Sequence, residues 1–268
     1  DIETYILRVP LGKERFYLSQ CAFPERNSLL VKVTTDEGLD GWGEGGQWGP
    51  PEPGKACVEQ DLQRMRAIRA AVGPETTLLV DCNHAYNAFN AVRMGRALED
   101  LGVGWFEEPV VPEDRAGYRE VRSKIRIPVA GGECEFTRFG FRDFIGEGCV
   151  DIVQPDVCAC GGISEFLKIS ALASSYGTMV IPHVWGSGVA LATALQVIAN
   201  LPNLPHTANP VPLQNAPVIE YDRNPNPLRD ALLVDNFVLE EHGVCVPKGP
   251  GLGIEVDEAV LQRYCGRG

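Results

Sequence analysis

Five polar residues follow apolar, strand-like runs at nearly equal intervals along the chain. Asp81, Glu107, Glu133, Asp156 and His183 are separated in turn by 26, 26, 23 and 27 residues. One strand and one helix of a parallel α/β fold occupy about this length, so each residue is expected to end its own strand. The strand ends of a (β/α)8 barrel meet at one face, where the active sites of this fold lie. The spacing therefore predicts that these side chains share one site.

Three of these residues have the chemistry of metal ligands. Asp81, Glu107 and Glu133 come from consecutive strand-like runs, and converging carboxylates repel one another unless a cation lies between them. Oxygen ligands of this kind suit Mg²⁺, with Mn²⁺ as a second choice. Alternatively, each acid begins a surface loop and caps the next helix. That alternative explains any one acid but not the equal spacing, so we predict a divalent metal site.

His183 is predicted to carry a proton, because an unperturbed imidazole titrates near neutral pH. Asp156, one strand earlier, would hold the ring in one tautomer and raise its basicity. The alternatives are a buried structural histidine and an aspartate that serves only its turn. Glu220 ends the last strand-like run, where a protonated carboxyl could hydrogen-bond to an anionic intermediate. An ordinary strand-end acid is the other interpretation of Glu220.

Three further residues are candidates for substrate contacts. Asn83 and His84 follow Asp81 closely enough to touch a substrate or to orient a metal ligand, and Trp185 closely follows His183. A half-exposed loop histidine is an equally good interpretation of His84. Glu108 could pair with a cation or contact solvent, and the sequence assigns it no role.

The elements that must position these residues alternate between strands and helices. Strand-like runs are expected at 77–83, 103–109, 127–133, 150–156, 178–184 and 217–222. Helical patterns lie between most of them, which predicts a parallel sheet with helices packed outside it. Residues 28–45 read as part of an antiparallel β meander with a turn at 36–38, and 58–72 as a helix stopped by Gly73.

The composition is that of a globular protein with a sizeable core. Among 268 residues, 44% are hydrophobic, and the net charge is -12 without a basic cluster. We therefore expect neither a nucleic-acid partner nor an anionic membrane surface. The sequence contains no apolar run of about 18 residues and does not start like a signal peptide. Cys82, Cys149, Cys158 and Cys160 are interpreted as reduced, buried residues of a cytoplasmic protein.

Taken together, the motifs resemble the mandelate racemase and muconate lactonizing branch of the enolase superfamily. The matching stretches are "GWGE", "VDCN" with Asp81, "WFEEP" with Glu107, "AGGE" with Glu133, "QPDVCACGG" with Asp156, "PHVWGSGV" with His183, and "KGPGLGIEVD". They cover nearly the whole chain in order. Within this branch, "VEQDL", "DVCACGG" and "PHVWGSGVALA" are most similar to the galactarolactone cycloisomerase group of acid-sugar enzymes.

The resemblance implies a modified (β/α) barrel at 54–225 and a capping domain built from 1–53 and 226–268. It implies Mg²⁺ on the three acids and proton abstraction next to the carboxylate of an acid sugar or its lactone. The metal would stabilise the enediolate, His183 would act as base or acid, and Asp156 would orient it. Glu220 looks like the acid that faces the substrate. Homo-oligomers are frequent in this superfamily.

The expected reaction ends in β-elimination, so cycloisomerisation is the leading prediction. Acid-sugar dehydration is the first alternative. Racemisation is weaker, because it needs two opposed bases and only His183 is visible. A non-catalytic protein that keeps the fold for assembly, and a structural Ca²⁺ site, are rivals of a different class.

One family motif is missing. The resemblance implies a K-x-K on the second barrel strand, and no K-x-K occurs in this sequence. Residues 54 to 222 number 169, against roughly 250 for a typical barrel, so early strands are expected to be lacking between 53 and 58. Three explanations fit the missing motif: the sequence omits segments of a longer protein, the gene has an internal deletion, or the protein is an inactive relative. We favour the first, because an open arc exposes two sheet edges.

Overall fold

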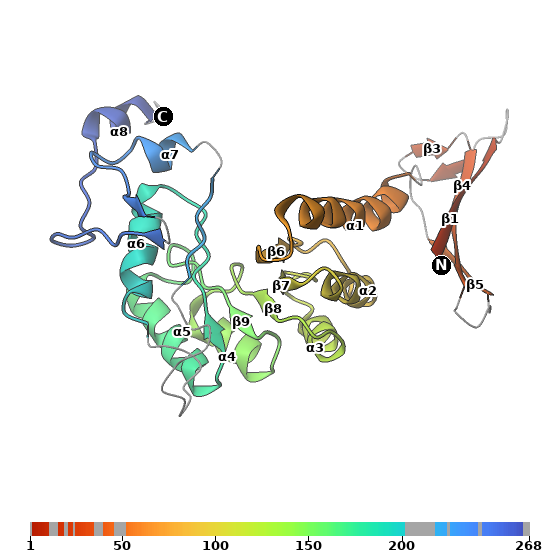
Figure 1. Ribbon diagram of the computed structural model, residues 1–268, viewed down its shortest axis with the longest axis horizontal. Coiled ribbons are helices and arrows are strands. Elements are labelled where there is room, and N and C mark those ends of the chain that lie inside the picture. Colours follow the sequence, from red (N-terminus) through yellow and green to blue (C-terminus); the bar gives the residue numbers. More distant parts are fainter. Residues whose placement is uncertain are drawn as a thin grey trace. The chain divides into compact units, whose positions relative to one another are not determined.

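The computed structural model describes most of the chain as two compact units, Asp1–Thr76 and Thr77–Gly268 (Figure 1). The described residues are 2–10, 16–18, 21–23, 25–34, 40–45, 52–201, 218–223, 226–240 and 243–264. Side chains are described for most of these residues from Asp61 onward.

The first unit combines antiparallel strands with one long helix. Its elements are β1 (Ile2–Pro10), β2 (Phe16–Leu18), β3 (Cys21–Phe23), β4 (Glu25–Thr34), β5 (Asp40–Gly45) and α1 (Glu52–Val72). The sheet order is β1-β4-β5, and β2 pairs with β3. The predicted antiparallel pair is therefore confirmed as β4 and β5, while its turn at 36–38 lies outside the described residues.

Helix α1 confirms the predicted helix and begins six residues before it, at Glu52. It ends at Val72, and the following Gly73 has a φ of 78° that favours a residue without a Cβ. Residues 53–58, where early barrel strands are expected to be lacking, lie inside this helix. The backbone is thus continuous and helical across the expected junction, and α1 belongs to the first compact unit.

The second unit is built on a parallel sheet in the order β10-β9-β8-β7-β6. The strands are β6 (Leu78–Asp81), β7 (Val103–Glu107), β8 (Val129–Gly131), β9 (Ile152–Val153) and β10 (Met179–Val180). Five of the six predicted strands are confirmed, in sequence order and with parallel pairing. This is an α/β architecture of the (β/α)-barrel type.

A helix follows each of these strands. The helices are α2 (Ala88–Glu99), α3 (Arg115–Lys124), α4 (Thr137–Gly146), α5 (Ile163–Ser175) and α6 (Gly188–Ile198). In Figure 1 the first four lie along the same side of the strands. The chain then forms α7 (Pro227–Asp230), β11 (Leu239–Glu240), β12 (Gly243–Val244) and α8 (Glu258–Tyr264).

The prediction of a sixth strand at 217–222 was wrong for the residues that the structure describes there. Residues 218–223 have no strand assignment. The carboxyl of Glu220 connects this segment to the ends of β9 and β10, because it accepts hydrogen bonds from Gln154 and from the backbone of Val184. Side-chain bonds replace a backbone ladder here, so a strand-like sequence does not become a strand.

Strand alternation divides the core into two layers. On β7, Trp105 packs with Ala130, Ile152 and Ile181 in one buried cluster, whereas Phe106 is fully buried in the other layer. The helices supply further large buried side chains, among them Leu98, Tyr118, Phe141, Phe144, Phe166 and Ile169. This double burial holds the ends of the strands rigidly for the polar residues that follow.

Capping side chains and one glycine determine where the chain leaves a strand and begins the next helix. The side chains of Asn87, Asp114 and Ser187 accept hydrogen bonds from backbone N–H groups at the starts of α2, α3 and α6. Gly132, just after β8, has a φ of 126°, and a Cβ there would approach Phe141 to 3.1 Å. A glycine is therefore needed where the chain turns toward Glu133.

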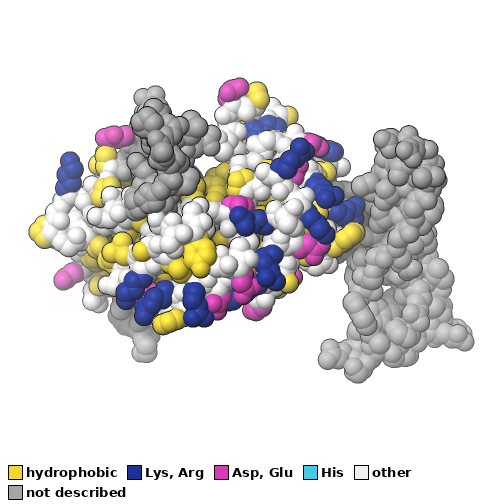
Figure 2. Space-filling model, turned by 90° about the horizontal axis from the view of Figure 1, so that it is seen from below, with side chains coloured by type: hydrophobic (Ala, Val, Ile, Leu, Met, Phe, Trp, Pro, Cys, Tyr) yellow, Lys and Arg dark blue, Asp and Glu magenta, His cyan; other side chains and the backbone are white. Residues whose placement is uncertain are grey.

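Ion pairs connect neighbouring helical units on the outside. Arg138 on α4 donates both to Oε1 and to Oε2 of Glu165 on α5, at 2.8 and 2.7 Å. Arg122 on α3 donates to Asp151 at 2.8 Å. Figure 2 shows basic and acidic side chains interspersed over one face. Of the helices among the described residues, none has both the length and the apolar character of a membrane span.

The cysteines only partly match the expectation of burial. Cys149 and Cys160 are buried and Cys82 is half-buried, but Cys158 is exposed. Cys158 differs because it lies beyond β9 in the turn around Asp156, where its backbone N–H donates to the Asp156 carboxylate. Burial was expected from the apolar run before it, which ends too early to cover this residue.

Candidate active site

The five regularly spaced residues lie at the carboxyl edge of the parallel sheet. Asp81 and Glu107 end β6 and β7 and are directly paired across the two strands. Asp156 and His183 form an isolated parallel bridge beyond β9 and β10. Glu133 follows β8 by two residues. The strand order thus brings these side chains to one edge, while their roles stay predictions.

His183 lies between two carboxylates. Its Nδ1 is 2.8 Å from Oδ2 of Asp156, and its Nε2 is 3.2 Å from Oε2 of Glu133. Burial lowers the pKa of His183, but the hydrogen bond to Asp156 and the charges of Glu133 and Glu220 outweigh it and raise the pKa to about 9. This ring is therefore held in a fixed orientation and favours the protonated form.

Asp156 keeps its charge because hydrogen-bond donors surround it. Its Oδ1 accepts the backbone N–H of Cys158 at 2.7 Å, while Oδ2 faces His183. Burial would raise the pKa of Asp156, but the hydrogen bonds from His183 and Cys158 outweigh it and lower the pKa below its usual range. A charged Asp156 can fix the imidazole tautomer, and its role as a positioning residue stays a prediction.

Glu220 reaches the same edge from outside the sheet. Its Oε1 accepts a hydrogen bond from Nε2 of Gln154, and its Oε2 accepts one from the backbone N–H of Val184, both at 3.1 Å. Burial is the main cause that raises the pKa of Glu220 above its usual range. The environment thus favours a neutral carboxyl, and the role of Glu220 toward an anionic intermediate stays a prediction.

Glu107 is the most crowded of the predicted metal ligands. It is 6% exposed, and its Oε2 accepts the indole N–H of Trp105 at 3.1 Å. Burial, with added repulsion from Glu220 and Asp81, raises the pKa of Glu107 to about 7. A buried carboxylate beside other acids is costly without a compensating cation, and oxygen donors of this kind suit a hard divalent ion. Among the described residues, the oxygens of Asp81, Glu107 and Glu133 do not gather within 4.8 Å of one another, so a shared metal site stays a prediction.

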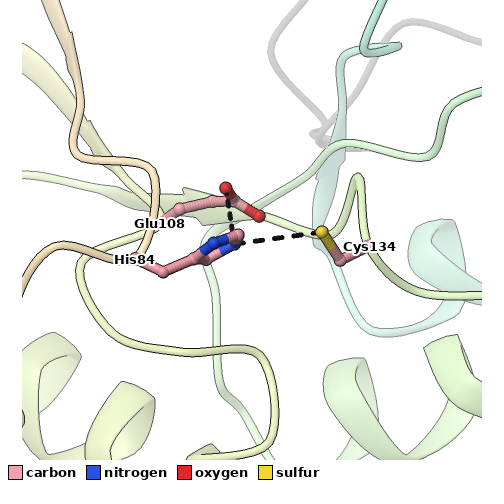
Figure 3. Close-up of side chains that lie close together, drawn as sticks. All are labelled: His84, Glu108 and Cys134. Carbon is pink, nitrogen blue, oxygen red and sulfur yellow. Dashed lines mark hydrogen bonds and ion pairs between the residues drawn. The ribbon is translucent and has the colours of Figure 1, made fainter.

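A second group of side chains gathers beside these acids, at the ends of β6, β7 and β8 (Figure 3). Nε2 of His84 is 2.7 Å from Oε2 of Glu108 and 3.9 Å from Sγ of Cys134. The three ligand atoms all lie within 4.8 Å of one another. We call His84, Glu108 and Cys134 the His–Glu–Cys cluster.

The placement of Glu108 corrects one interpretation. Its side chain is 1% exposed and points toward His84, so it does not contact solvent. His84 and Glu108 adopt left-handed backbone conformations with φ of 63° and 41°. Such angles are uncommon for residues with a Cβ and turn these two side chains toward one another. Whether His84 also contacts substrate stays a prediction.

The other candidate substrate contacts lie at the same edge or near it. Asn83 donates its backbone N–H to Oδ1 of Asp81 at 2.8 Å, which orients that carboxylate. Trp185 is 72% exposed and lines a pocket together with Glu220 and Arg229. Both positions leave their side chains open to a ligand, and their roles stay predictions.

Sequence reasoning missed Gln154 and Cys134. Gln154 is fully buried, and its amide holds Glu220. It precedes Asp156 by two residues in the same run, so strand alternation was a usable signal for it. Cys134 directly follows Glu133, and no pattern in the sequence indicates that it meets His84.

Comparison with known proteins places the chain in a family. The model of the enolase C-terminal domain-like family matches residues 32–260. A D-galactarolactone cycloisomerase of Agrobacterium fabrum is 44% identical over 207 residues, which are 77% of this chain and 54% of that protein. An arabinonate dehydratase of Saccharolobus solfataricus is 35% identical over 211 residues, 79% of this chain and 53% of that protein.

The chain spans about half the length of these curated relatives. Among solved structures, a 3,6-anhydro-D-galactonate cycloisomerase from Zobellia galactanivorans aligns with a TM-score of 0.70 at 28% identity, covering 98% of each chain. The family match, the identity to these relatives and the parallel sheet agree with the motifs identified in the sequence. This chain belongs to the enolase superfamily.

Proposed function

We propose that the protein is an Mg²⁺-dependent cycloisomerase that abstracts the proton next to the carboxylate of an acid sugar lactone and then opens the ring by β-elimination. The observation that carries the proposal is His183, held between Asp156 and Glu133 at the strand-end edge. The 44% identity to a D-galactarolactone cycloisomerase supports a lactone of a hexaric acid as the substrate class.

Asp81, Glu107 and Glu133 would hold the metal. Their oxygen-only chemistry and the raised pKa of Glu107 support a hard divalent ion at this point, with Mn²⁺ as a substitute for Mg²⁺. When bound, Mg²⁺ supplies positive charge that stabilises the anion formed on the substrate carboxylate.

His183 would exchange the proton through Nε2, because Asp156 occupies Nδ1. In its neutral form the ring takes the α-proton, and the electron pair of the C–H bond passes into the carboxylate as an enediolate. The enediolate then expels the oxygen on the neighbouring carbon together with its bonding electrons. In a lactone this ring oxygen leaves as a carboxylate and the ring opens, whereas a hydroxyl would take up a proton and leave as water. A neutral Glu220 would donate a hydrogen bond to the anionic intermediate.

Dehydration of an acid sugar is the second candidate. The same base and the same enediolate serve both reactions, and only the leaving group differs, a ring oxygen in one and a hydroxyl in the other. Identity of 35% to an arabinonate dehydratase and to an L-rhamnonate dehydratase of Saccharopolyspora erythraea supports this alternative. The homo-oligomeric state and cytoplasmic location stay predictions.

The test separates proton abstraction from elimination. The expressed protein is incubated in D₂O with D-galactarolactone and a panel of aldonic and aldaric acids, with Mg²⁺ or with EDTA, and followed by NMR. We expect Mg²⁺-dependent exchange of the α-proton, with ring opening for the lactone. Exchange and loss of water only from the open acids would favour the dehydratase.

Intact mass is measured on the same sample, because a mass above the 29.2 kDa of this sequence identifies a longer parent protein. A protein that exchanges no α-proton on any compound, at either mass and with Mg²⁺ present, contradicts the proposal. It would then fit a non-catalytic member of the fold.

A further inference from the structure

The His–Glu–Cys cluster is chemically unlike the three predicted Mg²⁺ ligands. It offers one imidazole nitrogen, one carboxylate oxygen and one sulfur, whereas the predicted Mg²⁺ ligands offer only oxygens. Nitrogen and sulfur ligands select borderline or soft transition metals over Mg²⁺. We propose that His84, Glu108 and Cys134 form a second cation site, for a divalent transition metal of the zinc class.

The distances support this assignment. The three ligand atoms lie within 4.8 Å of one another, with Nε2 of His84 2.7 Å from Glu108 Oε2 and 3.9 Å from Cys134 Sγ. Ligands bound at about 2.0–2.3 Å around a tetrahedral zinc are separated by roughly 3–4 Å. Small side-chain adjustments would therefore close the site around one ion, with the fourth position left for water.

Burial of Glu108 gives an independent reason for a cation. The side chain is 1% exposed, and among the described residues its Oε2 has no partner in good hydrogen-bond geometry despite the nearby His84 ring. A buried carboxylate without adequate partners destabilises the fold. A cation in contact with Oε2 would supply the missing partner and the compensating charge.

The local charges agree with the geometry. Burial raises the pKa of Glu108, and Glu133 and Asp81 add to the effect through repulsion. Partial burial and the charges of Glu108 and Glu133 raise the pKa of the Cys134 thiol as well. A cation held by the cluster would therefore lie beside carboxylates whose charges it would offset.

The site would tie three strand ends together. His84 follows β6, Glu108 follows β7 and Cys134 follows β8, so one ion would link three neighbouring βα units. The exposed Cys134 provides the access route from solvent. This proposal shares no ligand with the proposed Mg²⁺ site and does not depend on the proposed activity.

Cobalt(II) is the probe, because a thiolate bound to Co²⁺ gives a charge-transfer absorption in the near ultraviolet that oxygen ligands do not give. The metal-stripped, reduced protein is titrated with Co²⁺ in the presence of excess Mg²⁺. We expect the charge-transfer band to saturate at one equivalent, and Zn²⁺ to abolish it by displacement.

Variants assign the band to its ligands. Cys134→Ser should abolish the band, whereas Cys158→Ser, which changes an exposed cysteine outside the cluster, should retain it. His84→Ala and Glu108→Gln should each weaken Co²⁺ affinity by at least about tenfold. Circular dichroism and urea unfolding show which variants remain folded, so a lost band is scored only in folded protein.

Two results would overturn the proposal. One is the absence of a thiolate band in the parent protein, and the other is an unchanged band in Cys134→Ser. If Cys134→Ser does not fold, zinc K-edge absorption of the parent protein decides between a shell with one sulfur, as expected, and a shell without sulfur.

Discussion

Two histidines at the same sheet edge, His183 and His84, each face a buried carboxylate, but the two acids differ. The Asp156 side chain is 12% exposed and accepts a backbone N–H in addition to the imidazole. The Glu108 side chain is 1% exposed, and its Oε2 lies 2.7 Å from Nε2 of the His84 ring. Donors lower the pKa of Asp156, whereas burial raises the pKa of Glu108.

The difference shows that the partners of the acid, more than the presence of a histidine, decide what such a pair can do. A carboxylate that stays charged holds an imidazole in one tautomer and stabilises its protonated form, which suits proton transfer. A carboxylate buried without enough donors is stabilised when a cation binds. The same sheet edge thus carries one pair suited to moving protons and one suited to holding a metal.

Substitution of His183 is expected to have the largest effect on activity. His183→Asn removes the ring that exchanges the proton, so we expect turnover to fall on the order of 10³-fold while Mg²⁺ affinity stays nearly the same. Steady-state kinetics and calorimetric Mg²⁺ titration measure the two quantities. His242→Asn, the same change outside the candidate site residues, is the control. Full activity in His183→Asn would rule out its role as base.

Burial of an acid should also appear as a pH dependence of stability in the metal-free protein. The pKa of Glu107 is raised from 4.5 to about 7 in the folded state. The folded state therefore binds the proton more tightly, and its stabilising contribution is complete below pH 4.5 and lost as the pH rises through 7. In EDTA, the free energy of unfolding should fall by about 3 kcal/mol over this window.

Urea unfolding at a series of pH values measures this slope. Saturating Mg²⁺ should flatten it, because the bound metal favours the charged carboxylate. Glu107→Gln should remove most of the slope in EDTA as well. A flat pH profile of stability in the metal-free parent protein would mean that Glu107 titrates as an ordinary acid. Burial would then not raise the pKa of this carboxyl.

A smaller effect is expected at Asp156. Asp156→Asn keeps the shape but loses the charge that holds the His183 tautomer, so kcat should fall on the order of 10²-fold with little change in KM. The split between kcat and KM is the readout, because a general loss of structure would change both. Asp100→Asn, at the exposed end of α2, serves as the matched control. Equal effects of the two substitutions would contradict the positioning role.

Periodicity predicted the sheet because strands buried on both faces leave a clear apolar pattern, as at Trp105 and Phe106. It failed at 217–222, where a side chain rather than a backbone ladder attaches Glu220 to its neighbours. Strand-end spacing predicted that the three acids and His183 lie at one edge of the sheet, since strand order follows chain order, while their roles stay predictions.

The His–Glu–Cys cluster could not be predicted in the same way. Its formation depends on left-handed backbone angles at His84 and Glu108, which residues with a Cβ adopt too rarely for a sequence pattern to indicate them. The sequence also could not predict the burial of Glu108. Glu107 and Glu108 are adjacent residues of the same type, yet one contacts Trp105 and the other His84.

The succession of Glu107 and Glu108 has an evolutionary consequence. One peptide bond joins the acid bonded to Trp105 and the acid that faces His84. A single-residue insertion or deletion just before Glu107 would displace both side chains together, because one peptide bond joins the two residues. A substitution at one of the two positions is therefore expected to affect one acid at a time, whereas a change in chain length just before them is expected to affect both.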